Sequence, residues 1–320
     1  MVAAACFLSA GPTLAAGAQP RAWVSGLGLD AATCGAITTP CRTLQYSHDN
    51  VVAPGGSIYV KDPANYGQLV IRQAISIIND GSGTATILAT SGDAVAVQAA
   101  STDVVLLKGL TLDGAGTGTT GVKVTLAGKV AIEDCTIQSF VTASGGNGVL
   151  ITPTQTGDAT PLTFLIANSR LIGNGPGGSG FTYVMTLPQS GLAKFPIGQI
   201  RGTTISGSFY GVFASGPGSV LVADSVIEGA GLGVGLFVDR NNALLLAKRA
   251  RVDGMANGVD ATNTGTVTLS QSVFTHNQID IATLQARSRA TANSASDSDL
   301  SDFNVIAFGE ALSAFGSVQS

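Results

Sequence analysis

Apolar and polar residues alternate in short runs along most of this chain, and glycine-rich turns separate the runs. The stretches "VADSVIEGAGLGV" (222–234) and "AKRARVDGMANGV" (247–259) show the pattern twice, 25 residues apart. Aligned without a gap, their apolar, glycine and carboxylate positions coincide. Alternation with a period of two predicts short strands, and its return at a regular interval predicts a repeat architecture.

The repeat extends well beyond these two stretches. Seven related segments recur at offsets of 22 to 34 residues: "GLTLDG" (109–114), "DCTIQS" (134–139), "NSRLIG" (168–173), "GTTISG" (202–207), "DSVIEG" (224–229), "RARVDG" (249–254) and "QSVFTH" (271–276). A second short strand, a turn and another apolar run follow each segment. Each repeat is therefore one coil of a solenoid. We predict an all-β fold, a single-stranded right-handed parallel β-helix over 41–282, with a short capping helix within 41–53.

The alignment also assigns faces, because successive side chains of a strand point to opposite sides. One inward column is aliphatic: Leu112, Ile137, Leu171, Ile205, Ile227, Val252 and Phe274. The inward column two residues earlier is mostly small: Leu110, Cys135, Ser169, Thr203, Ser225, Ala250 and Ser272. Glycines at 121, 148, 180, 211, 233 and 258 mark a column where either φ is positive or space is short.

The composition of the chain bears on which partners are expected. The chain of 320 residues has 42 glycines, only 11% charged residues and a formal net charge of −4. No basic cluster is present to neutralise phosphates, so nucleic acid is not an expected partner. No stretch after the N-terminus approaches a membrane span.

The ends of the chain differ from the repeat. Residues 1–18 are apolar and uncharged and end on Ala16-Gly17-Ala18, so we predict a signal peptide there, although no Lys or Arg precedes the apolar run. Residues 19–40 form an N-terminal extension, and 283–320 form a polar segment with a possible distal cap at 305–316. The predicted location is secreted, periplasmic or at the cell surface.

The cysteines fit this location. Cys34 and Cys41 are close together in "CGAITTPC", and in an exported protein we expect a disulfide, the alternative being two free thiols. Cys135 is expected in the core. The sequence contains no C-x-x-C pair, so a metal site built from cysteines is not expected.

Outward acidic residues are the first candidate for chemistry. If Ile227 and Val252 point inward, Glu228 and Asp253 point outward on adjacent coils, with Arg251 beside Asp253. Two stacked carboxylates repel, so one pKa rises unless a cation or arginine compensates. Such a group suits a catalytic acid and base, or a Ca²⁺ site. The alternative is a solvated ladder of balanced charges.

The longer coils are a second candidate, because long loops on a rigid scaffold often carry sites. Tyr183, Phe195 and Tyr210 can present rings to sugars, and Lys194 can add a polar contact. The alternative is that the rings pack beneath the loops.

The segments "PGGSIYV" and "YGQLVIRQAISIIND", followed by the repeats, resemble right-handed parallel β-helix proteins of the pectin-lyase-like superfamily. The resemblance covers about 42–282 and is closest to exported bacterial β-helix repeat proteins. It implies the fold but not one activity, because the superfamily includes lyases, hydrolases, esterases, tailspikes and adhesins. The catalytic motifs of its polygalacturonases, pectate lyases and methylesterases are missing, and the one Trp, Trp23, precedes the helix.

Two functions follow as hypotheses. The first is an exported protein that binds an extracellular or cell-surface glycan or serves as a surface or structural protein. The second is a polysaccharide lyase, or less favoured a glycoside hydrolase, acting on an acidic polysaccharide.

Overall fold

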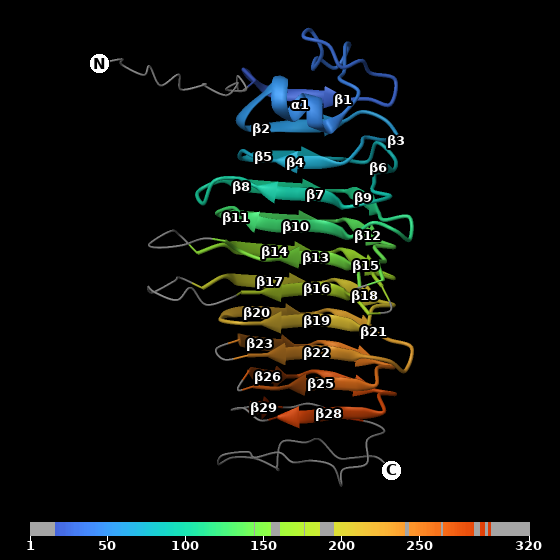
Figure 1. Ribbon diagram of the computed structural model, residues 1–320, viewed down its shortest axis with the longest axis vertical. Coiled ribbons are helices and arrows are strands. Elements are labelled where there is room, and N and C mark those ends of the chain that lie inside the picture. Colours follow the sequence, from blue (N-terminus) through green and yellow to red (C-terminus); the bar gives the residue numbers. More distant parts are fainter. Residues whose placement is uncertain are drawn as a thin grey trace, which may run out of the picture.

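The computed structural model describes residues 17–143, 145–154, 161–175, 177–185, 195–240, 243–263, 265–284, 289–291 and 294–295. It confirms a parallel β-helix, in which three parallel sheets run the length of a rod (Figure 1). From β2 onward, the described chain passes in each coil from sheet 1 to sheet 2 to sheet 3 and then returns to sheet 1. The predicted signal peptide, apart from its last two residues, and the possible cap at 305–316 lie outside the described residues.

The strands of each sheet follow one another along the rod in chain order. In the described residues, sheet 1 consists of β1 (Gln19–Val24), β2 (Val52–Val60), β5 (Ile75–Ile78), β8 (Val104–Lys108), β11 (Lys129–Glu133), β14 (Thr163–Ala167), β17 (Ile197–Arg201), β20 (Gly218–Ala223), β23 (Ala243–Lys248), β26 (Thr266–Ser270) and β29 (Arg289–Thr291). Sheet 2 consists of β3 (Ala64–Asn65), β6 (Ala85–Leu88), β9 (Leu110–Asp113), β12 (Thr136–Gln138), β15 (Arg170–Ile172), β18 (Thr204–Ser206), β21 (Val226–Glu228), β24 (Arg251–Asp253), β27 (Val273–Thr275) and β30 (Ser294–Ala295). Sheet 3 consists of β4 (Leu69–Ile71), β7 (Asp93–Gln98), β10 (Thr120–Leu126), β13 (Asn147–Ile151), β16 (Ser179–Val184), β19 (Tyr210–Ser215), β22 (Val234–Asp239), β25 (Asn257–Ala261) and β28 (Ile279–Leu284).

The predicted inward columns form the core. Ile205, Ile227 and Val252 are directly in register on β18, β21 and β24, and all three are buried. The aliphatic and the small column are buried throughout, Cys135 included. Each coil therefore stacks the same kind of side chain on its neighbours, which is why the sequence repeats.

A hydroxyl ladder links the coils at the turn from sheet 1 to sheet 2. The Ser169 hydroxyl donates to the Ala167 carbonyl (2.8 Å) and accepts the backbone N–H of Cys135 from the preceding coil (3.2 Å). Ser225 repeats this geometry with Ala223 and with the N–H of Thr203. Small polar residues recur in this column because their hydroxyls satisfy backbone groups that would otherwise be buried without partners.

The glycine column exists because space is short. A Cβ on Gly211 would lie 2.4 Å from Ile227 Cγ2 and 2.5 Å from the Gly235 carbonyl oxygen, and the φ of Gly211 is not positive. One position in the predicted column is wrong. The register places Gly235, not Gly233, after Gly211, and Gly233 instead occupies a turn with φ +73°.

The N-terminal end is closed by a short helix and a loop. α1 (Leu44–Asn50) is shorter than the predicted segment, because Thr43 caps its start and β2 begins at Val52. The loop that follows β1 folds back onto β1. Cys41 forms a parallel β-bridge with Val24, and the loop covers this part of the edge of sheet 1. Within the described residues, no helix has the length and apolar character that a membrane crossing requires.

Candidate functional site

The outward carboxylates lie next to each other as the repeat predicts. Glu228 and Asp253 are paired in register at the ends of β21 and β24. Both lie just before the turns from sheet 2 to sheet 3. We call the described residues of these turns the 2–3 corner (114–119, 139–143, 145–146, 173–175, 177–178, 207–209, 229–233, 254–256 and 276–278). Adjacent strands are about 4.8 Å apart, so the two side chains project from neighbouring coils onto one surface.

Asp253 is heavily engaged by protein donors. One carboxylate oxygen accepts the Thr275 hydroxyl (2.7 Å) and lies 2.8 Å from His276 Nδ1. The other oxygen accepts Arg251 Nη2 at 2.8 Å. The hydrogen bonds from Thr275 and His276, together with the charge of Arg251, hold the pKa of Asp253 below its usual value. Arg251 therefore compensates the charge of Asp253 in the way that a stacked pair of carboxylates requires.

His276 is the member of this group that the sequence analysis did not include. It follows β27 in the next coil, with a left-handed φ of 53°, and its side chain is 71% exposed. The repeat offset of about 22 residues places it one coil beyond Asp253 and one position further along the chain. The repeat offset could have indicated that His276 lies next to Asp253. A histidine in a turn such as "FTHNQ" is, however, ordinarily exposed to solvent.

A neighbouring ion pair supports the alternative of a balanced surface ladder. Arg249 binds Asp224 with two hydrogen bonds of 2.5 and 2.8 Å, and both side chains are about half exposed. The Arg249 guanidinium lowers the pKa of the Asp224 carboxyl. Exposed pairs of this kind contribute little to stability.

The cluster around Asp253 does not fit Ca²⁺. Both Asp253 oxygens are occupied by protein donors, whereas calcium prefers six to eight oxygen ligands. In the described residues, the one group of three potential ligand side chains that converges is Asp30, Cys34 and Cys41.

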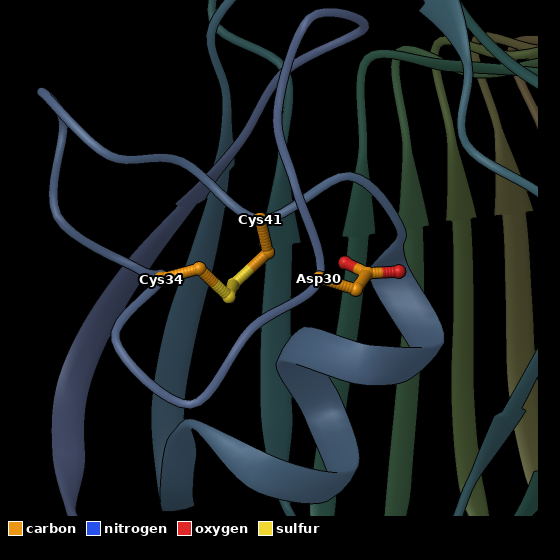
Figure 2. Close-up of side chains that lie close together, drawn as sticks. All are labelled: Asp30, Cys34 and Cys41. Carbon is orange, nitrogen blue, oxygen red and sulfur yellow. A yellow bond between two sulfur atoms is a disulfide. The ribbon is translucent and has the colours of Figure 1, made fainter.

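That convergent group is structural. Cys34 and Cys41 form a disulfide, as Figure 2 shows, so neither sulfur is a thiolate that binds a metal. Asp30 instead accepts the backbone N–H groups of Arg42 (2.7 Å) and Thr43 (3.0 Å) and the Thr43 hydroxyl. These bonds fix the loop to the start of α1.

Tyr183 and Phe195, two of the predicted aromatic contacts, differ in their exposure to solvent. Tyr183 is buried, its hydroxyl donates to the Pro217 carbonyl, and burial raises its pKa. It therefore packs in the core and does not present a ring to a ligand. Phe195 is partly exposed before β17, on the side opposite the 2–3 corner of its coil, and Lys194 lies outside the described residues.

Tyr210 belongs to an aromatic cluster on the outer surface. We use "ring cluster" for Phe209, Tyr210, Phe213 and Phe237, which are all half-buried. Tyr210 stacks on Phe213 (5.3 Å between centroids) and on Phe237 (5.2 Å), and meets Phe209 edge-on at 4.8 Å. The rings come from neighbouring strands β19 and β22 and from the 2–3 corner, so they form a platform over two coils.

An open groove of about 800 Å³ lies on the same corner. Its lining residues are small or uncharged: Gly116, Thr117, Val141, Thr142, Ala143, Gly145 and Gly177. They come from the corner turns of three successive coils. The backbone N–H of Tyr210 donates to the carbonyl of Gly178 (3.0 Å), next to the lining residue Gly177, so the coil that carries Tyr210 directly follows the last coil of the groove.

Comparisons with protein-family models and with curated proteins found no match for this chain. The fold and the chemistry of this surface are therefore what define it: a parallel β-helix protein with a groove and an Asp–His–Arg cluster at the 2–3 corner and an aromatic platform on the adjoining face of sheet 3.

Proposed function

We propose that this chain is an exported protein that binds a glycan along the 2–3 corner. The observation that carries the proposal is the ring cluster on the coils that directly follow the open groove. Aromatic faces stack against the apolar C–H faces of sugars, while hydroxyls and backbone groups of a shallow groove bind sugar hydroxyls. The cystine at Cys34–Cys41 suits an oxidising compartment, as the expected signal peptide does.

The glycan proposal is tested by affinity electrophoresis of the full chain through gels that contain neutral or acidic polysaccharides. Tyr210→Ala and Phe237→Ala are expected to weaken retention about tenfold each, the order of one aromatic contact. Tyr59→Ala is the matched control, because Tyr59 stacks on Trp23 near the N-terminal end of the rod, away from the ring cluster. Equal retention of all variants would refute the proposal.

A second function, cleavage of an acidic polysaccharide, is favoured by one observation. One Asp253 oxygen lies 2.8 Å from His276 Nδ1, and Glu228 projects from the neighbouring coil. In a lyase, His276 would take the proton from the carbon beside a uronate carboxylate, and the electron pair would form a C4–C5 double bond as the C4–O bond breaks. Glu228 would protonate the leaving oxygen. Arg251 would attract the uronate carboxylate.

This activity is tested by following the ultraviolet absorbance of unsaturated products and the release of reducing ends. His276→Ala and Glu228→Gln are expected to abolish either signal, and Asp253→Asn to reduce it and change its pH profile. Asp224→Asn is the control, because Asp224 lies at the turn from sheet 1 to sheet 2, at the other end of β21, and pairs with Arg249. Absence of product from folded protein would exclude cleavage of the substrates tested and leave glycan binding unaffected.

A further inference from the structure

The N-terminal tip, residues 25–40, exposes aliphatic side chains to an unusual degree. Leu27 is 96% exposed, Leu29 73% and Ile37 52%. The tip projects beyond β1 and α1 at the N-terminal end of the rod's long axis (Figure 1). Single exposed leucines are common on protein surfaces, but three from one short loop require an explanation.

The tip is held rigid while it displays these side chains. The Cys34–Cys41 disulfide and the bonds from Arg42 and Thr43 to Asp30 fix one half of the loop (Figure 2). The N–H of Leu29 donates to the Pro40 carbonyl (3.2 Å), which ties the two turns of the loop together. A loop fixed in this way cannot bury its leucines by collapsing, and it loses little entropy when it binds.

Two exposed cations at this end can contact an anionic partner. The nearby Asp62 is half-buried, and its carboxylate accepts the Ser25 hydroxyl and the N–H of Gly26 (2.6 Å). Lys61 is exposed, and its ammonium donates to the Ile37 carbonyl (3.0 Å), so a cation lies beside the apolar side chains. Arg21 is also exposed on β1.

The apolar area argues for a lipid surface rather than a second copy. Three aliphatic side chains offer on the order of a few hundred Å², whereas each partner of a stable protein interface contributes about 800 Å². A bilayer requires no matching shape, and it accepts apolar side chains below a basic rim. We propose that the N-terminal tip inserts Leu27, Leu29 and Ile37 into an anionic lipid surface, which would stand the rod away from the membrane. This proposal does not depend on glycan binding.

The test is flotation of the full chain with vesicles of phosphatidylcholine mixed with phosphatidylglycerol. The double variant Leu27→Ser/Leu29→Ser is expected to bind about 100-fold more weakly, because burial of one leucine contributes roughly tenfold or more. Leu232→Ser is the matched control, since Leu232 is 65% exposed on the side of the rod. The apolar residues 1–16 are the same in all variants, so differences report on the tip.

A second readout locates the contact. Leu27→Trp is expected to shift its fluorescence to shorter wavelength on vesicles, and Leu232→Trp to remain unchanged. Equal binding by the double variant and the wild type would overturn the proposal, as would equal loss in Leu232→Ser. Concentration-dependent dimers that the double variant loses, without vesicle binding, would instead show an interface between copies.

Discussion

The Gly211→Ala substitution tests whether close contact between coils explains the glycine column. The added Cβ would lie 2.4 Å from Ile227 Cγ2 and 2.5 Å from the Gly235 carbonyl oxygen. Overpacking of a core costs about 1–3 kcal/mol, and two contacts, one with backbone, place this site near the upper end. Alanine also lowers the conformational entropy of the unfolded chain, which stabilises the folded state by about 0.4–1 kcal/mol. The net loss is about 2 kcal/mol, or about 4–8 °C in Tm at roughly 2–4 °C per kcal/mol for larger domains.

Gly177→Ala is the matched control for this experiment. Gly177 has no atom within 4 Å of its added Cβ, and its φ is not positive. The same change should therefore leave Tm unchanged or raise it slightly. Thermal unfolding followed by circular dichroism measures both variants. If Gly211→Ala unfolds at the same temperature as Gly177→Ala, steric exclusion does not explain the column.

Three further predictions concern single groups. Asp253→Asn should lower the free energy of unfolding by less than about 1 kcal/mol at neutral pH. Because the native pKa of Asp253 is lowered, this difference should be present above the ordinary Asp pKa of about 3.9 and disappear as pH falls below the native value, which urea titrations across pH measure. Replacing Cys34 and Cys41 together by Ser should lower the free energy of unfolding by about 2.5 kcal/mol for a loop with a sequence separation of 7; an unchanged urea midpoint would contradict this. Burial raises the pKa of the Cys135 thiol to about 12, so iodoacetamide should label it only in denaturant, as mass spectrometry can show.

The repeat was predictable from sequence because stacking imposes the same demand on every coil. Ile227 and Val252 required the same buried environment, and their alignment was sufficient to pair Glu228 with Asp253. The error at Gly233 arose because its turn also needs a glycine, for positive φ rather than for space.

The parts of the site that the sequence did not predict depend on turn conformation and on contacts between strands. His276 contacts Asp253 from a turn in which its own backbone is left-handed. Tyr183 was expected at the surface, but the orientation of β16 turns it into the core. The ring cluster joins Tyr210 to Phe237 across two coils, and neither residue alone distinguishes a platform from isolated surface aromatics.

The hydroxyl ladder has a direction. In each described link, an N–H of the earlier coil is satisfied by a side chain of the later coil, as Cys135 is by Ser169 and Thr203 is by Ser225. Synthesis delivers the earlier coil first, so these N–H groups obtain their partners only when the next coil has formed. If folding begins at the disulfide-closed end, each new coil would leave such donors for the coil that follows it.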